Sequence, residues 1–214
     1  MFRKNFKNSY NKTTIIMAGI ILFICFMPSI LINEQSNTEK IIKETKNGTK
    51  QITKLDIIDY YQDKFFEIIT RNDVLLSMEN NEYVHKDLND LSQLFEKVEH
   101  KINSQNEYFK RYKEIEEKYK DNFGENILEM STFALQNYEL IDELFNDTYK
   151  EVKIKLKDSE LDELKNNQEE WFNKVLSYEQ HVKSQDLGSI EQLVNLNSQI
   201  LMKSFRTLLL MMYL

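Results

Sequence analysis

Glycine and proline, the residues that most often end helices and form tight turns, are almost absent from this chain. Its 214 residues include 4 Gly and 1 Pro. So few of them argue against hairpin turns and a sheet of many strands, and they favour long helices. The one stretch in which apolar and charged residues alternate as in a strand, residues 152–157, is short and has helical patterns on both sides. The sequence therefore predicts an all-α protein.

An uncharged apolar segment lies near the N-terminus, at residues 14–32. A helix of this length, rising about 1.5 Å per residue, nearly spans the hydrocarbon core of a bilayer. The residues before it carry four positive charges and no acid. The positive-inside rule therefore places residues 1–13 in the cytoplasm and the remainder of the chain outside. We expect an uncleaved signal anchor, a single transmembrane helix that holds the C-terminal part on the extracellular side of the cell membrane.

Two alternatives for the same segment stay open. A cleaved signal peptide needs small residues at two positions, and Ser29 is preceded two residues earlier by Met27. A lipoprotein would carry its lipid on Cys25, although the residue before it is the large Ile24. All three alternatives export residues 33–214.

The exported part is acidic and free of cysteine. Residues 33–214 hold 24 Lys and Arg (the 28 of the whole chain without the 4 of residues 1–32) against 35 Asp and Glu, a net charge of −11. Such a surface repels nucleic acid, because phosphate binding requires clustered basic side chains. It either attracts a basic partner or keeps the protein soluble. Because Cys25 is the only cysteine, the exported part holds neither a disulfide nor a cysteine zinc site.

Two helices are predicted after a polar linker at residues 33–50. The first covers residues 52–78, and the second is long, at residues 82–122. Apolar residues recur along the second helix in steps of three and four over residues 84–112. This spacing is typical of a coiled-coil seam. We interpret residues 51–123 as an antiparallel helical hairpin, with a homo-oligomer through the seam as the alternative.

Three more helices are predicted in residues 124–214. Gly124 ends the long helix, and the next one covers residues 125–156. A fourth begins at Ser159 and ends near Gly188, and a fifth follows to the end of the chain. Its last turns, residues 208–212, are Leu and Met only. We expect them to pack against the other helices, with docking onto the membrane as the alternative.

An ordered set of residues in these three helices carries a resemblance to a known family. They begin with a Glu-Met pair, continue with spaced Asp, Asn and Tyr residues and a Gln-x-x-Trp motif, and end with Gly-Ser and an Arg. In this chain they are Glu129, Met130, Asp142, Asn146, Tyr149, Leu164, Gln168, Trp171, Gly188, Ser189 and Arg206. Over residues 125–213 the chain resembles the lysozyme inhibitor LprI-like family, small exported or lipid-anchored bacterial proteins. The resemblance implies a helical domain at residues 124–214 that binds lysozyme or another muralytic enzyme at the cell envelope.

The chain departs from the family pattern at several positions. Phe133 stands where many members have a disulfide cysteine, and Phe145 replaces the Leu before the Asn. Lys174-Val175-Leu176 occupies the place where members often have Tyr-Arg-Asp. A fold without these disulfides needs a larger apolar core, since each bridge contributes about 2–4 kcal/mol. A function carried by the Arg-Asp pair is not expected here.

The matched residues look structural rather than catalytic. Trp171 and Tyr149 lie on or beside apolar stripes, which predicts core packing. Asp142 and Asn146 are one helical turn apart and suit a hydrogen bond. We expect the set to specify the fold more than a binding site.

No pattern for catalysis or for a cofactor is found. The three histidines, His85, His100 and His181, are scattered, and Glu82-x-x-His85 has no second copy to complete a di-iron site. We therefore expect a binding protein without enzymatic activity, metal or cofactor. The runner-up hypothesis is a coiled-coil scaffold or sensor-like module of the envelope.

Overall fold

The computed structural model describes residues 53–71, 82–120 and 124–214. The anchor predicted at residues 14–32 and the linker predicted at residues 33–50 lie outside these ranges. Among the helices of the described ranges, none is both long and apolar enough to cross a membrane.

The secondary structure of the described residues is entirely helical, which confirms the all-α prediction. The elements are α3 (Lys54–Thr70), α4 (Glu82–Glu99), α5 (Glu107–Tyr119), α6 (Ile127–Lys155), α7 (Asp158–Lys183), the 3₁₀ turn η2 (Gly188–Ile190) and α8 (Glu191–Met211). The last three α-helices lie close to the ranges that the sequence predicts.

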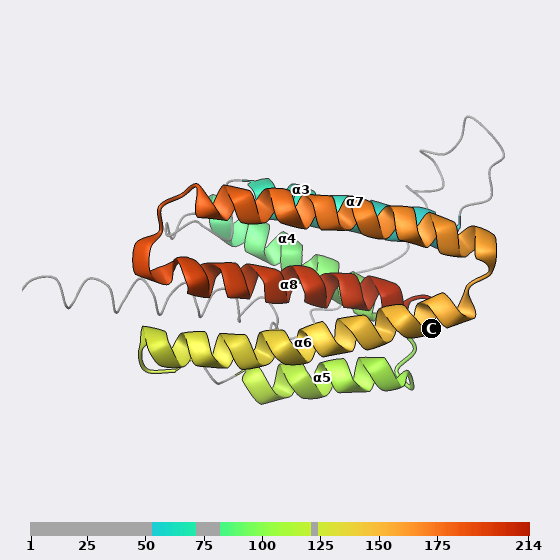
Figure 1. The fold of residues 1–214 in the computed structure, drawn as a ribbon, viewed down its shortest axis with the longest axis horizontal. Helices are drawn as coiled ribbons and strands as arrows, with labels where there is room; N and C mark the ends of the chain where they lie inside the picture. Colours follow the sequence, from blue (N-terminus) through green and yellow to red (C-terminus); the bar gives the residue numbers. More distant parts are fainter. Residues whose placement is uncertain (1–52, 72–81, 121–123) are drawn as a thin grey trace, which may run out of the picture.

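The C-terminal helix α8 is the centre of the bundle. Figure 1 shows α8 between α6 and α7, with α5 along the outer side of α6 and with α3 and α4 behind. Fifteen of its 21 residues are buried, on every side of the helix. An α-helix that is apolar all round needs such a central place. The Leu and Met residues of 208–211 are buried, so the prediction that this end packs against other helices is confirmed.

Three phenylalanines join the N-terminal helices to α8. The ring of Phe205 stacks on Phe65 of α3 at 4.5 Å between centroids and lies 4.9 Å from Phe95 of α4. All three side chains are buried. Residues on both sides of Gly124 therefore share one hydrophobic core.

The prediction of one continuous helix over residues 82–122 is wrong. α4 ends at Glu99, and α5 begins at Glu107. Asn106 caps the new helix, because its Oδ1 accepts hydrogen bonds from the backbone N–H groups of Tyr108 and Phe109 at 2.9 and 3.2 Å. Short polar side chains in the intervening residues compete with helical hydrogen bonds and favour such a break.

The two pieces of the interrupted helix pack on different neighbours. α4 contacts α3, as the hairpin expectation requires, whereas α5 contacts α6. The seam residues Leu91, Phe95, Val98 and Tyr112 are buried within this one chain. Self-association through residues 84–112 stays a prediction, and these side chains are already occupied by contacts inside the molecule.

Candidate functional site

The side chain of Arg206 lies at the meeting point of α3, α7 and α8 and is fully buried. Its Nε donates to Gln168 Oε1 at 3.0 Å, and its Nη1 donates to Gln62 Oε1 at 2.7 Å. Its guanidinium carbon lies 6.0 Å from the centroid of the Trp171 ring. Two amide oxygens and an aromatic face thus compensate a charge that burial would otherwise make unfavourable.

Arg206 has no carboxylate in direct contact among the described residues. Burial lowers the pKa of Arg206 to about 10, so the guanidinium stays charged at neutral pH. Its Nη2 has no hydrogen-bond partner within the described part of the chain. Asp59 of α3 is close enough to interact with it electrostatically, and Asn167 Nδ2 donates to the carboxylate of Asp59. Burial raises the pKa of Asp59, and the repulsion of Glu170 and Asp63 adds to the effect.

Aromatic residues from α6 and α7 cover this buried charge. The Trp171 ring lies 5.5 Å from the ring of Phe145, which stacks on Tyr149 at 6.3 Å. Trp171 is 4% exposed, as its place on an apolar stripe predicts. Lys153 approaches the ring of Tyr149 at 4.7 Å. These residues bring the aromatic rings of α6 and α7 into contact.

A second polar contact joins α6 to α8 close by. The Lys203 ammonium binds the Asp142 carboxylate and donates to the Tyr138 hydroxyl at 2.9 Å. Asn146 Nδ2 donates to the same carboxylate at 3.2 Å, which is the hydrogen bond expected from their spacing. Lys203 is one helical turn from Arg206, so these family-type residues converge on one segment of α8.

Glu129, Met130, Gly188 and Ser189 lie away from this cluster, near the start of α6 and in the turn from α7 to α8, which are at the same end of the bundle (Figure 1). Glu129 Oε2 accepts a hydrogen bond from the Glu125 backbone N–H at 2.7 Å, and Met130 is buried. Gly124 has φ +71°, and a Cβ there would lie 2.7 Å from the Met130 backbone nitrogen. Gly188 has φ +59° in the α7–α8 turn. The two glycines thus allow the turns before α6 and before α8.

The family-type residues around Arg206 therefore form a structural frame, in which they bind one another. Among the described residues, no group of His, Cys, Asp or Glu side chains is placed to hold a metal ion. The sequence prediction overlooked Gln62, Asp59 and Lys203, whose roles depend on distant partners. The one available sequence signal for these partners was Arg206 itself. A charged side chain buried in the apolar helix α8 needs hydrogen-bond acceptors.

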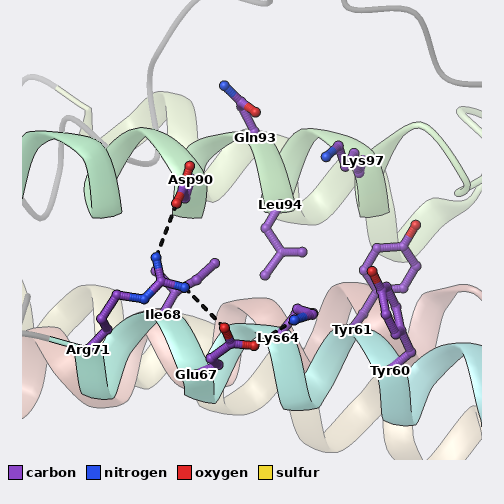
Figure 2. A pocket seen from close by; sticks show the side chains of 10 residues that line it. All are labelled: Tyr60, Tyr61, Lys64, Glu67, Ile68, Arg71, Asp90, Gln93, Leu94 and Lys97. Carbon is purple, nitrogen blue, oxygen red and sulfur yellow. Dashed lines mark hydrogen bonds and ion pairs between the residues drawn. The ribbon is translucent and has the colours of Figure 1, made fainter. Parts of the chain in front are cut away.

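A groove of about 200 Å³ lies between α3 and α4 (Figure 2). Tyr60 and Tyr61 form one end of it, and Ile68 and Leu94 supply apolar surface in its middle. Arg71 lies at the other end. Its guanidinium binds Glu67 at 3.1 Å, Asp87 at 2.9 Å and Asp90 at 3.4 Å.

A half-buried cluster of acids and a lysine joins the end of α4 to α5. Lys113 Nζ lies 2.6 Å from Glu99 Oε2 and 2.8 Å from Glu116 Oε2. The Tyr112 hydroxyl donates to Glu116 at 3.2 Å. Burial raises the pKa of Glu116 to about 7, although Lys113 opposes the shift. The cluster holds α4 and α5 together at the break between them.

The outer face of α7 carries exposed apolar side chains. Phe172 is 57% exposed and Leu176 is 42% exposed, one helical turn apart on the same face. Glu169, one helical turn before Phe172, is exposed and forms no hydrogen bond or ion pair with another described residue. Exposed apolar side chains rimmed by polar residues are a feature of protein-binding surfaces.

Comparisons of the chain with family models, with curated proteins and with solved structures find no match. The resemblance to the lysozyme inhibitor LprI-like family therefore stays a prediction.

Proposed function

We propose that this chain is a non-enzymatic binding protein of the cell envelope that acts on a basic muralytic enzyme in the manner of a lysozyme inhibitor. The observation that carries the proposal is the outer face of α7. There Phe172 and Leu176 are exposed, and Glu169, one helical turn before Phe172, has no partner among the described residues. A surface of this kind suits a partner with an apolar contact and a basic rim.

The charge of the domain supports the same partner. Residues 125–214 contain 16 Asp and Glu and 9 Lys and Arg, a net charge of −7. Many enzymes that hydrolyse cell walls are basic, so opposite charges accelerate their encounter with this domain at low salt. The predicted anchor at residues 14–32 would hold the domain at the membrane, on the side where such enzymes act.

The buried frame around Arg206 supports binding of a partner at the surface of the protein and not at a site inside the bundle. The side chains that the family resemblance singles out are engaged with one another, as in the Arg206–Gln168 and Asp142–Asn146 hydrogen bonds. A partner therefore has to recognise exposed residues, and those of α7 are the most suitable.

The test measures hydrolysis of insoluble peptidoglycan by a basic lysozyme, with and without the purified full-length chain in a non-ionic detergent. We expect inhibition at low salt that weakens as salt is added, because the encounter depends on charge. Absence of inhibition at a large molar excess in low salt would contradict the proposal.

A pair of matched variants tests the surface. Phe172→Ser removes the exposed ring from α7, whereas Leu128→Ser removes a side chain that is 77% exposed on α6. We expect the first to weaken inhibition about tenfold or more, in the range of interface hot spots, and the second to leave it unchanged. Equal effects of the two changes would exclude α7 as the contact surface.

A further inference from the structure

The two ends of the groove between α3 and α4 differ in how their charged side chains are paired. At the Arg71 end, Lys64 pairs with Glu67, and Arg71 pairs with Glu67, Asp87 and Asp90. At the tyrosine end, Lys97 lines the groove and has no hydrogen-bond or ion-pair partner among the described residues. The unpaired charge in the groove is thus a cation, although the whole chain has a net charge of −7.

A second cation lies beside the same end. The Lys101 ammonium is 6.0 Å from the centroid of the Tyr61 ring and has no carboxylate partner in the described ranges. Lys97 and Lys101 are one turn apart along the chain, so both charges favour an anion near the two tyrosines. Figure 2 shows Lys97 on α4 and Lys64 on α3, the two helices that border the groove, with Lys64 bound to Glu67.

The walls of the groove favour a ring. Tyr60 and Tyr61 meet edge to face, with their centroids 5.4 Å apart, and rings pack favourably against such aromatic surfaces. Ile68 and Leu94 add apolar contact between the tyrosines and the ion pairs. A volume of about 200 Å³ is below the range of roughly 300–1,000 Å³ that drug-sized ligands occupy. The groove therefore suits a single ring with a short substituent.

We propose that this groove binds a small carboxylate carried on a ring, with the ring against Tyr60 and Tyr61 and the carboxylate on Lys97. The amide of Gln93, on the same face of α4, supplies a further hydrogen-bonding group at the groove. Among the described residues that line the groove, Lys97 has the one unpaired ammonium, and a single charge there suits a singly charged carboxylate better than a doubly charged phosphate. Both a sugar acid and an aromatic acid have this chemistry, and the experiment separates them.

The experiment applies saturation-transfer difference NMR to the full-length chain in a non-ionic detergent, with micelles alone subtracted. The probes are glucuronate and benzoate, and their neutral counterparts are glucose and benzamide. We expect at least one carboxylate to give a signal that its neutral counterpart does not give. A signal from glucuronate alone assigns a sugar acid, and one from benzoate alone assigns an aromatic acid.

Two lysine variants locate the binding. Lys97→Met keeps the apolar stem and removes the charge. Lys110→Met makes the same change on α5, where the ammonium donates to Gln105 at 3.2 Å outside the groove. We expect the first to reduce affinity about tenfold, the loss of one charge-assisted hydrogen bond, and the second to leave affinity unchanged. Binding of neither carboxylate, equal binding of the neutral probes, or equal effects of the two variants would overturn the proposal.

Discussion

Arg206 and Gln62 are 144 residues apart in sequence, yet the guanidinium donates to the amide oxygen at 2.7 Å inside the core. Gln62 is 2% exposed and Arg206 is fully buried. The bond joins α3 to α8, and Gln168 brings α7 to the same guanidinium. A buried charge held by neutral acceptors depends strongly on each of them, since a lost acceptor cannot be replaced by water.

Gln62→Leu should therefore destabilise the fold more than Arg206→Met. The first change leaves a buried guanidinium with one acceptor fewer, which costs about 2–4 kcal/mol. The second removes the charge and keeps most of the volume, so the expected loss is about 1–2 kcal/mol. Urea unfolding of both variants measures the difference. A smaller loss in Gln62→Leu than in Arg206→Met would show that the acceptor is dispensable.

Two turn glycines, one before α6 and one between α7 and α8, offer a second comparison. Gly124 and Gly188 both have positive φ, but a Cβ at Gly124 would lie 2.7 Å from backbone atoms, whereas a Cβ at Gly188 meets nothing within 4 Å. Gly188→Ala should cost about 1 kcal/mol for the left-handed backbone alone. Gly124→Ala adds a steric clash that requires the start of α6 to shift, so its cost should exceed about 2 kcal/mol. Thermal unfolding of the two variants measures the difference, and equal costs would show that the start of α6 adjusts freely.

Much of the fold follows from local signals in the chain. The scarcity of Gly and Pro predicts the helical class, Gly124 marks the boundary before α6, and the apolar run at residues 208–211 predicts a buried helix. Each of these signals depends on composition or on neighbours within a few residues.

Features that depend on distant contacts were not predictable in the same way. The apolar spacing continues through Ile102, which is buried in the core, so the seam concealed the break between α4 and α5. The partners of Arg206 come from α3 and α7, and the partners of Lys203 come from α6. The groove between α3 and α4 likewise exists only once the two helices pack.

Substitution of Phe205 and of Phe172 compares a phenylalanine in the core with one on the surface. Phe205→Ala removes a ring that contacts Phe65 and Phe95 and is 1% exposed. It should lower the free energy of unfolding by about 3–5 kcal/mol, because a cavity remains in the core. Phe172→Ala, on the 57% exposed side chain of α7, should change it by less than about 0.5 kcal/mol. Urea unfolding provides both values, and a large loss in Phe172→Ala would show that this ring is part of the core.

Glu116 should make stability depend on pH near neutrality. Its folded-state pKa is raised from 4.5 to about 7 by burial, so between these values the folded protein binds more protons than the unfolded chain. The contribution of this group is therefore fully present below about pH 4.5 and is lost as pH rises through about 7. The side chain of the Glu116→Gln variant is neutral in both the folded and the unfolded protein. The variant therefore does not lose this contribution to stability as pH rises.

The measurement compares urea unfolding of wild type and Glu116→Gln from pH 4.5 to pH 8. We expect the stability of the wild type to fall by about 1–3 kcal/mol relative to the variant across this range. Glu114→Gln is the control, since Glu114 is an exposed acid of the same helix. The free energy of unfolding of this control should change with pH in parallel with that of the wild type. A Glu116→Gln curve parallel to that of the wild type would mean that Lys113 keeps the Glu116 carboxylate ionised throughout.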